Sequence, residues 1–404
     1  MALLPPSATE DARYLLLTRA LRGFADGLVS VLLAGYLTRL GFTPFRVGAL
    51  VTGTLLGSAA LTTAVGLAGQ GVERRRVLFF AALLMLVTGI GFAGLSAFWP
   101  LLLVAVVGTL NPTAGDVSVF LPVEQAVLAE TVRGSDRTAV FAWYNVAGTL
   151  AGGLGALASG VPEMIARLAG ADPLAAERGG FLFYAAVAAG VAAIYRRLSP
   201  SVERAAPAGQ APLARSRRVV LQLATLFSLD AFGGGFVVQS LLVLWLYRRF
   251  QLSVGNAGAI FFGAGMVGAL SQFLSAKLAA RIGHVRTMVY THLPANLFLV
   301  AAGVVPSAPL AITFLLLRAS LSSMDVPARQ AYVMALVPPE ERMAASSVTN
   351  VPRSLAAAIP PVFAGILLDR SAFGWPLVLG GVLKVLYDFL LLMQFRALRP
   401  PVER

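Results

Sequence analysis

Long apolar stretches alternate with short polar segments along almost the whole chain. A helix that crosses a bilayer needs roughly 20 mostly apolar residues. We predict six such helices in each half of the chain, over residues 14–40, 45–68, 77–98, 100–129, 138–161, 180–195, 219–247, 254–278, 287–305, 308–337, 344–368 and 375–395. The pattern therefore predicts an all-α polytopic membrane protein with twelve transmembrane helices.

The two halves of the chain repeat one another. The segment PVEQA at 122–126 matches PARQA at 327–331, and at the same spacing Asn145 matches Asn350. Near the second span of each half, Gly48-Ala49 matches Gly258-Ala259. Several matches in one order indicate an internal duplication, which is frequent in transporters. We therefore expect two pseudo-symmetric six-helix bundles.

The stretch between the repeats differs in composition from both. Residues 196–218 are rich in Arg, Pro, Ala and Ser and are typical of a solvated linker. We expect an N-terminal bundle over 1–195, a cytoplasmic linker over 196–218 and a C-terminal bundle over 219–404.

Composition supports lipid as the solvent. Hydrophobic residues make up 57% of the chain and charged residues 13%, whereas soluble domains have about 25% charged residues. The net charge of +13 comes from basic residues gathered in the segments between spans, which is the positive-inside pattern and not a nucleic-acid-binding face. It predicts a multi-pass protein of the inner (cytoplasmic) membrane with both termini cytoplasmic.

Several classes of chemistry are disfavoured. The chain has no cysteine, and its two histidines are His284 and His292, so we expect no metal site and no cofactor. Neither Lys277 nor Lys384 is followed by Ser or Thr, so the chain has no phosphate-binding loop for ATP. Neither a catalytic triad nor a metal constellation marks an enzyme.

The repeat resembles the major facilitator superfamily. That family favours G-x-L-A-D-R-x-G-R-R between the second and third spans, and here GLAGQGVERR occupies 66–75, with Gln70 in place of the Asp and Arg74 kept. The equivalent loop of the second half keeps Arg281 and Gly283. The resemblance implies a central cavity lined by the first, fourth, seventh and tenth spans. Gly148, Gly152, Gly153 and Gly155 in the fifth span indicate close helix packing.

Ionisable side chains inside the spans carry the strongest functional signal. Each costs roughly 2.5–3.5 kcal/mol at the bilayer centre, so they must face one another, water or a cavity. These residues are Arg19, Arg22, Asp26, Asp116, Glu124, Asp230, Arg318, Asp325, Arg329, Arg353, Lys384 and Asp388. Most of them lie on the first, fourth, seventh and tenth spans, where the resemblance places the cavity.

We name six candidate ligands for substrate or ion: Arg22, Asp26, Asp116, Asp230, Arg318 and Asp325. Asp26 either binds a proton or cation or pairs with Arg22, four residues earlier. Asp230 has no basic neighbour within a turn, and burial favours the protonated form of such a carboxyl. Asp116 follows Asn111-Pro112, where a broken helix exposes backbone. Arg318 either recognises an anion or pairs with Asp116 or Asp26.

Gates are expected at the cytoplasmic ends of the spans. Glu124 and Arg329 occupy equivalent repeat positions with opposite charge and either form a gate or extend to the interface. Further gating candidates are Arg74, Arg137, Arg281 and Arg342. Lys384 and Asp388, four residues apart, are interpreted as a structural pair, and Arg353 as contacting the inner ends of neighbouring helices.

The leading functional hypothesis is a monomeric secondary active transporter that moves a small solute by alternating access, with H⁺ as coupling ion. Export of amphipathic compounds is the working interpretation, because many family members of this size perform it. Four acids, Asp26, Asp116, Asp230 and Asp325, favour a cationic or neutral substrate over an anion. Uptake or export of an organic anion or other metabolite, and a non-transporting membrane sensor with the same fold, are the alternatives.

Overall fold

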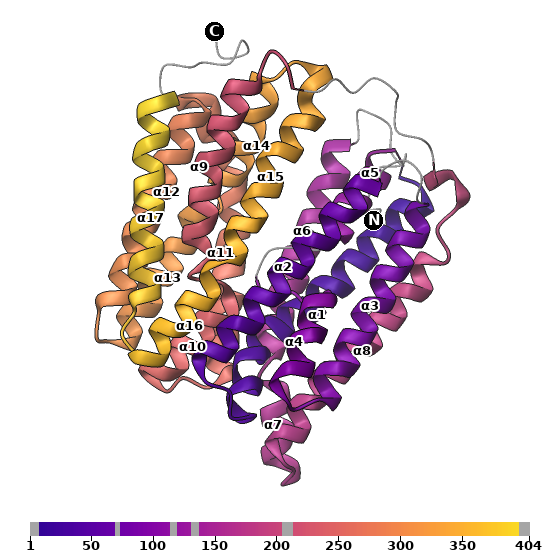
Figure 1. Cartoon of the computed structure of the whole chain (residues 1–404), viewed down its shortest axis with the longest axis vertical. Helices are drawn as coiled ribbons and strands as arrows, with labels where there is room; N and C mark the ends of the chain where they lie inside the picture. Colours follow the sequence, from indigo (N-terminus) through magenta and orange to yellow (C-terminus); the bar gives the residue numbers. More distant parts are fainter. Residues whose placement is uncertain (1–7, 69–72, 114–118, 131–136, 204–212, 396–404) are drawn as a thin grey trace.

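The computed structural model describes residues 8–68, 73–113, 119–130, 137–203 and 213–395. Throughout these ranges the regular secondary structure is helical, and the helices form two bundles side by side (Figure 1). The first bundle holds α1 (Glu10–Arg39), α2 (Pro44–Ala68), α3 (Arg74–Gly94), α4 (Phe98–Val107), α5 (Phe120–Glu130), α6 (Arg137–Ala158), α7 (Val161–Ala169) and α8 (Pro173–Tyr195).

The second bundle follows a short 3-10 helix, η3 (Pro200–Glu203). It holds α9 (Arg217–Gly235), α10 (Gln239–Phe250), α11 (Val254–Ile282), α12 (His284–Val304), α13 (Ala308–Ser322), α14 (Asp325–Leu336), η4 (Pro339–Glu341), α15 (Arg342–Ala358), α16 (Pro360–Arg370) and α17 (Trp375–Phe395).

The helices account for the apolar pattern of the sequence. Within the described ranges, 10 helices are long and apolar enough to cross a membrane, and Phe98–Val107 and Ala308–Ser322 are shorter apolar helices. Every predicted span overlaps a helix or a pair of consecutive helices. The chain is an all-α polytopic membrane protein with six spans in each bundle, as the sequence predicts.

The fourth and tenth spans are each interrupted near their middle. α4 ends at Val107, and the described residues that follow, 108–113, are not helical. They contain Asn111 and Pro112, and the Asn111 carboxamide accepts hydrogen bonds from Thr113 N (3.1 Å) and Oγ1 (2.8 Å). In the tenth span, Ser323 and Met324 separate α13 from α14. The break at Asn111-Pro112 agrees with the prediction made for that pair.

The seventh and eleventh spans are also broken, which the sequence analysis did not foresee. Phe236–Val238 separates α9 from α10, after the run Gly233-Gly234-Gly235. α16 begins with Pro360-Pro361, and proline lacks the N–H that would continue α15. The next amide, Val362 N–H, donates to Thr52 Oγ1 on α2 at 3.0 Å. This bond joins the two bundles.

Small residues bring helices into close contact within the first bundle. A Cβ on Gly27 of α1 would lie 2.0 Å from the carbonyl oxygen of Gly152 on α6, and a Cβ on Gly155 would lie 1.9 Å from the carbonyl oxygen of Phe24. Only glycine allows this approach of α1 to α6. The packing role predicted for these fifth-span glycines therefore agrees with the structure.

Two equivalent glycines mark the contact between the bundles. A Cβ on Gly48 of α2 would lie 2.3 Å from the carbonyl oxygen of Pro361 on α16, with Gly365 Cα at 3.1 Å. A Cβ on its counterpart Gly258 of α11 would likewise lie 2.2 Å from the carbonyl oxygen of Ala156 on α6. Both contacts lie toward the end of the molecule where α1 ends and α2 begins. We call this end the contact face.

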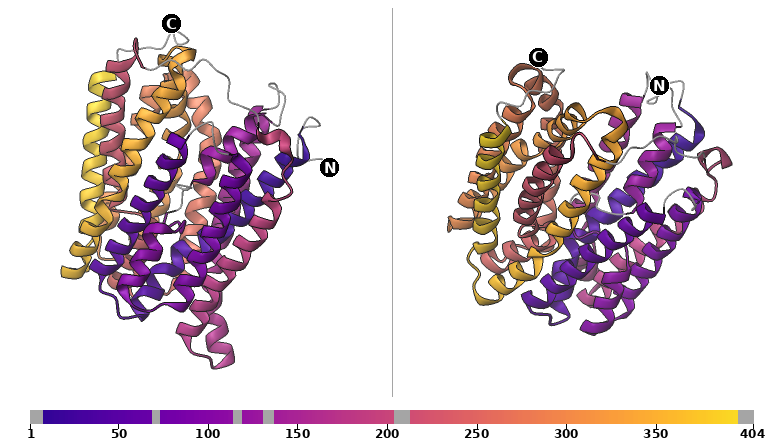
Figure 2. Two further views of the ribbon diagram at one scale, coloured as in Figure 1. Left: turned by 45° about the vertical axis from the view of Figure 1, so that its right-hand side comes forward. Right: turned by 45° about the horizontal axis from the view of Figure 1, so that its top comes forward.

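The opposite end, the linker face, holds the start of α1, the end of α8, the start of α9 and the end of α17 (Figure 2). Two carboxylates bind the chain on either side of 204–212. Glu203 accepts from the backbone N–H groups of Arg74 (2.7 Å) and Arg75 (2.8 Å) at the start of α3. Glu341 accepts from the N–H groups of Ala214, Arg215 and Ser216 just before α9. Each caps the exposed donors of a helix N-terminus.

Candidate functional site

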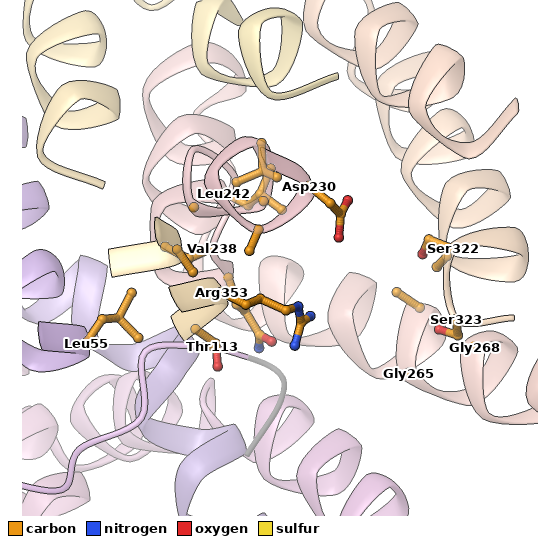
Figure 3. A pocket seen from close by; sticks show the side chains of 18 of the residues that line it. Leu55, Thr113, Asp230, Val238, Leu242, Gly265, Gly268, Ser322, Ser323 and Arg353 are labelled. Atoms are coloured by element: carbon orange, nitrogen blue, oxygen red, sulfur yellow. The ribbon is translucent and has the colours of Figure 1, made fainter. Parts of the chain in front are cut away.

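A cavity of about 690 Å³ lies between the two bundles. It lies on the linker-face side of the glycine contacts, and lining residues such as Asn350 and Ser354 are exposed. Apolar lining comes from both bundles and includes Leu55, Val238 and Leu242 (Figure 3). The charged lining consists of Arg19, Asp230, Arg318, Arg353 and Lys384.

Asp230 is the acid of this cavity, and it is bound by bases from three other helices. Its Oδ1 accepts from Lys384 Nζ of α17 at 2.6 Å, and its Oδ2 from Arg329 of α14 at 3.4 Å. His292 Nε2 of α12 lies 3.6 Å from the same Oδ1. Asp230 has no basic neighbour within a turn of its own helix, as the sequence shows, and its bases come from helices distant in sequence.

Arg329 joins Asp230 to a second carboxylate. It donates to Asp325 Oδ2 at 3.3 Å, one turn earlier on α14, and its guanidinium lies 5.5 Å from the Phe227 ring centre. Asp325 is 4% exposed and does not line the cavity. Its predicted role as a cavity ligand is therefore corrected to that of a buried partner of Arg329.

A His-Asp-Asn group extends the network away from the cavity. His292 Nδ1 lies 2.9 Å from Asp388 Oδ1, and Asn296 Nδ2 donates to Asp388 Oδ2 at 2.9 Å. Asp388 is fully buried. The predicted structural pair of Lys384 with Asp388 is wrong, because the first side chain bonds to Asp230 and the second to His292.

The first bundle contains a separate buried ion cluster around Glu124. Its carboxylate accepts from Arg22, from Thr18 Oγ1 at 2.9 Å, and from the hydroxyls of Tyr144 and Tyr195 at 2.5 Å each. Both members of the ion pair are about 99% buried or more. Arg22 is thus held away from the main cavity, and its predicted role there as a substrate ligand is corrected.

Glu124 and Arg329, the predicted gate, do not contact each other in this structure. Glu124 is bound inside the first bundle and Arg329 inside the second, each by partners of its own half. Their gating role stays a prediction.

The other predicted residues have varied positions. Asp26 lines a smaller hollow of about 80 Å³ beside the main cavity, together with Asn111 and Gln239. Arg281 lies exposed at the end of α11, and Arg74 Nη1 donates to the carbonyl of Val202 at 3.3 Å. Gln70, Asp116 and the side chains of Arg137 and Arg342 lie outside the described part of the structure.

Arg318 and Arg353 line the cavity with guanidinium groups that can bind a ligand. The Nε–H groups of Arg318 and Arg353 are buried and donate to no partner among the described residues. Within the described ranges neither side chain makes a hydrogen bond or an ion pair, although both line the cavity. The Arg353 guanidinium extends into the space between the helices (Figure 3). A buried guanidinium without a protein partner fits a ligand that brings its own carboxylate, sulfonate or phosphate.

Sequence reasoning singled out Arg318 and missed the importance of three others. Arg353 was interpreted as a helix-end contact, Lys384 as half of a local pair, and His292 was left without a role. Their position inside spans was the available signal, since an ionisable residue in a membrane helix marks a functional site by default. Among the described residues, no group of three or more His, Asp or Glu side chains is placed to hold a metal ion.

Two six-span bundles with a charged cavity between them define a membrane transporter. The chain belongs to the Major Facilitator Superfamily, whose sequence profile matches residues 15–317 and 223–404. Transporters of this superfamily bind small-molecule substrates within the membrane. The protein is accordingly a transporter and not an enzyme.

Comparison with individual proteins agrees with this assignment. The chain is 25% identical over 435 residues to an uncharacterized membrane protein of Saccharomyces cerevisiae, YJR124C, covering 98% of this chain and 96% of the yeast protein. Its fold is similar to a bacterial homologue of the iron transporter ferroportin in an inward-facing state, with a TM-score of 0.74, 15% identity and coverage of 95% and 98%. It is also similar to the human organic anion transporter MFSD10, with a TM-score of 0.62, 18% identity and coverage of 96% and 100%.

Proposed function

We propose that this protein is a secondary active transporter for an amphipathic organic anion. The observation that carries the proposal is the pair of partnerless guanidinium groups, Arg318 and Arg353, in the cavity between the bundles. Asp230 also lines the cavity, but its charge is already compensated by Lys384 and Arg329, so it does not compensate Arg318 or Arg353. An anion is the ligand that compensates these two charges.

The proposal replaces the preference for a cation or neutral substrate drawn from four acids. Of these acids, Asp325 is buried behind Arg329, Asp26 lines the smaller hollow, and Asp116 lies outside the described residues. Only Asp230 lines the main cavity among the described ones, and it is bound by Lys384. Among the described residues, the acids therefore do not set the charge of the cavity.

The apolar lining supports an organic body attached to the anionic group. Leu55, Val238, Leu242, Phe261 and Leu315 contribute to the wall. The cavity volume of about 690 Å³ falls within the usual range of roughly 300–1,000 Å³ for small-molecule sites. The amphipathic character expected from the sequence is thus retained. The charge is assigned from the cavity and not from the fold, since proteins with this fold carry very different cargoes.

We further propose alternating access by rocking of the bundle 1–195 against the bundle 219–404, with 196–218 as a cytoplasmic linker. The closed contact face and the open linker face correspond to an inward-facing state if the basic segments are cytoplasmic. Transport is coupled to H⁺ across the inner (cytoplasmic) membrane. One chain is the transport unit, because both of its halves line the cavity.

The test measures flux of three anions into proteoliposomes. They are 2-naphthalenesulfonate, a naphthalene carboxylate and a naphthyl phosphate. Arg318→Gln and Arg353→Gln are expected to reduce flux of the carried anion at least tenfold, because each removes a charge-assisted bond. Arg286→Gln, at an exposed position on the first turn of α12, is the control and should transport normally. Undiminished flux in both cavity variants would overturn the proposed site.

A further inference from the structure

The contacts of Asp230 point to a proton-operated exchange of partners in the second bundle. Lys384 Nζ and His292 Nε2 face the same atom, Asp230 Oδ1, at 2.6 and 3.6 Å. The lysine is within hydrogen-bond distance and the imidazole is just beyond it. Asp230 Oδ1 is thus hydrogen-bonded to Lys384, and the imidazole of His292 lies beside it without a hydrogen bond.

We propose that protonation of His292 transfers Asp230 Oδ1 from Lys384 to His292 and frees Lys384 to bind the substrate anion. The proposal rests on the proposed transport of an organic anion and assigns its proton-binding residue. A hydronium ion gives its proton to Nε2, so that one O–H bond breaks, one N–H bond forms and water leaves, and the imidazolium becomes a donor toward Oδ1. The ammonium that loses this oxygen already lines the cavity.

His292 is suited to this exchange by its chemistry and its surroundings. Histidine is the side chain whose ordinary charge change falls between pH 5 and 8. Here the ring is 4% exposed, and Asp388 fixes it from the opposite side through Nδ1 at 2.9 Å. The Nδ1 bond to Asp388 keeps Nε2 directed at Asp230.

The groups around His292 are of both signs. The buried network and the adjoining cavity wall contain Asp230 on α9, Asn296 on α12 itself, Arg318 on α13, Asp325 and Arg329 on α14, Arg353 on α15, and Lys384, Tyr387 and Asp388 on α17. The three acids are outnumbered by the four permanent bases in this set. A further proton therefore increases an existing positive excess, and an incoming anion relieves it.

Lys384 has room to move toward the cavity. The Lys384 stem passes Gly233 and Gly234, where a Cβ would lie 3.0 Å from Cγ and 3.5 Å from Cε. Gly234 itself lines the cavity. Two glycines beside a flexible four-carbon stem leave a path for the ammonium from Asp230 to the substrate.

The exchange couples proton and substrate in the symport sense. Proton binding creates an additional cationic group for the anion, and anion binding favours the protonated state, because linkage between two sites is reciprocal. For one proton per anion with one negative charge, a pH difference of one unit drives roughly tenfold accumulation. The coupling is lost if either His292 or Lys384 is replaced.

The experiment compares accumulation and exchange of radiolabelled 2-naphthalenesulfonate in proteoliposomes. This sulfonate stays ionised, so a pH gradient cannot drive it as a free acid. Wild-type protein should accumulate it roughly tenfold at a one-unit gradient. His292→Gln should reduce accumulation to about onefold while exchange of labelled for unlabelled anion continues. Lys384→Met, which removes a group that binds the anion, should reduce both accumulation and exchange. His284→Gln, at the start of the same helix, should behave as wild type.

Two results contradict the proposal in distinguishable ways. Gradient-driven accumulation that persists in His292→Gln would remove His292 as the proton site while leaving anion transport intact. Absence of both accumulation and exchange in the wild-type protein, for every anion of the series, would contradict the proposed function itself. If His292→Gln does not fold, His292→Asn, retaining a polar group of smaller size, provides the second test of gradient dependence.

Discussion

Glu124 and Arg329 occupy equivalent positions of the two repeats, carry opposite charge, and are each buried in an ion cluster of their own bundle. In the first bundle the base of the pair is Arg22 on α1 and the acid is on α5. In the second the acid is Asp230 on α9 and the base is on α14. The duplicated helices have kept the ion pair and exchanged the two charges.

The Glu124 cluster is expected to stabilise the first bundle. Glu124→Gln leaves Arg22 buried without its counter-charge, which should lower the free energy of unfolding by about 3–5 kcal/mol. Thermal unfolding of the purified protein in detergent measures the loss. Glu163→Gln on α7, whose ion pair with Arg167 is largely exposed on the arginine side, should change stability by less than about 1 kcal/mol. Equal stability of Glu124→Gln and Glu163→Gln would show that the cluster does not stabilise the first bundle.

The contact face is expected to depend on the absence of a side chain at Gly48. In Gly48→Leu, the new Cβ would lie only 2.3 Å from the Pro361 carbonyl oxygen. Because this distance is too short, the contact face should open. Spin labels at Thr43→Cys and Asp369→Cys, in a chain without native cysteine, report the separation of the bundles. The label distance should lengthen in Gly48→Leu.

Gly190→Leu is the matched control for this measurement. A Cβ at Gly190 meets no heavy atom within 4 Å, so this variant should keep the wild-type distance between the labels. An unchanged distance in Gly48→Leu would mean that the glycine contact does not hold the face closed.

Asp230 and Lys384 should be energetically coupled. Asp230→Asn leaves Lys384 buried without its carboxylate partner, and Lys384→Met leaves Asp230 with Arg329. The double variant removes both charges and should recover part of the stability lost by Asp230→Asn. A double-mutant cycle on thermal stability is expected to give an interaction of about 1–3 kcal/mol. Strict additivity would show that the 2.6 Å contact contributes nothing.

The attachment of the linker to the second bundle should weaken in acid. Backbone N–H groups of Arg215, Ser216 and Ala214 hold the pKa of Glu341 below its ordinary value. A depressed pKa means that the stabilisation is present above the unfolded-state value and is lost as pH falls through the folded-state value. Hydrogen exchange of amides 214–216, corrected for intrinsic rates, should therefore show protection at neutral pH that disappears on acidification.

Two variants test this pH dependence. Glu341→Gln should show weak protection at every pH, because an amide oxygen binds the N–H groups less strongly than a carboxylate. Glu340→Gln, at the exposed neighbouring position, should retain the wild-type profile. Protection that is independent of pH in the wild-type protein would contradict the assignment.

The sequence predicts the helices well because lipid imposes a length and a composition on each span. It also predicts close packing at Gly152 and Gly155, since a glycine-rich face has few other uses in a membrane helix. The sequence does not predict which charged residues pair with one another. Arg22 meets Glu124 across 102 residues and Lys384 meets Asp230 across 154. Local spacing suggested Asp26 and Asp388 instead, because pairing at i, i+4 is the only contact that a single helix reveals.

The charge of the cavity depends on these same tertiary contacts. Counting acids and bases within spans gave equal weight to Asp325, which is buried behind Arg329, and to Arg318, whose guanidinium is unengaged. Only folding determines which charges neutralise one another and which remain for a ligand. The prolines at 360 and 361 end α15, and the bond of Val362 N–H to Thr52 is a tertiary contact that the sequence does not reveal.

The most direct test of the account is charge selectivity in the wild-type protein. Uptake of 2-naphthalenesulfonate, a naphthyltrimethylammonium cation and a neutral naphthalenesulfonamide should be compared in the same proteoliposomes, with protein-free vesicles as background. The account predicts protein-dependent uptake of the anion at least tenfold faster than that of the cation. Protein-dependent uptake of the cation with exclusion of the anion would contradict it.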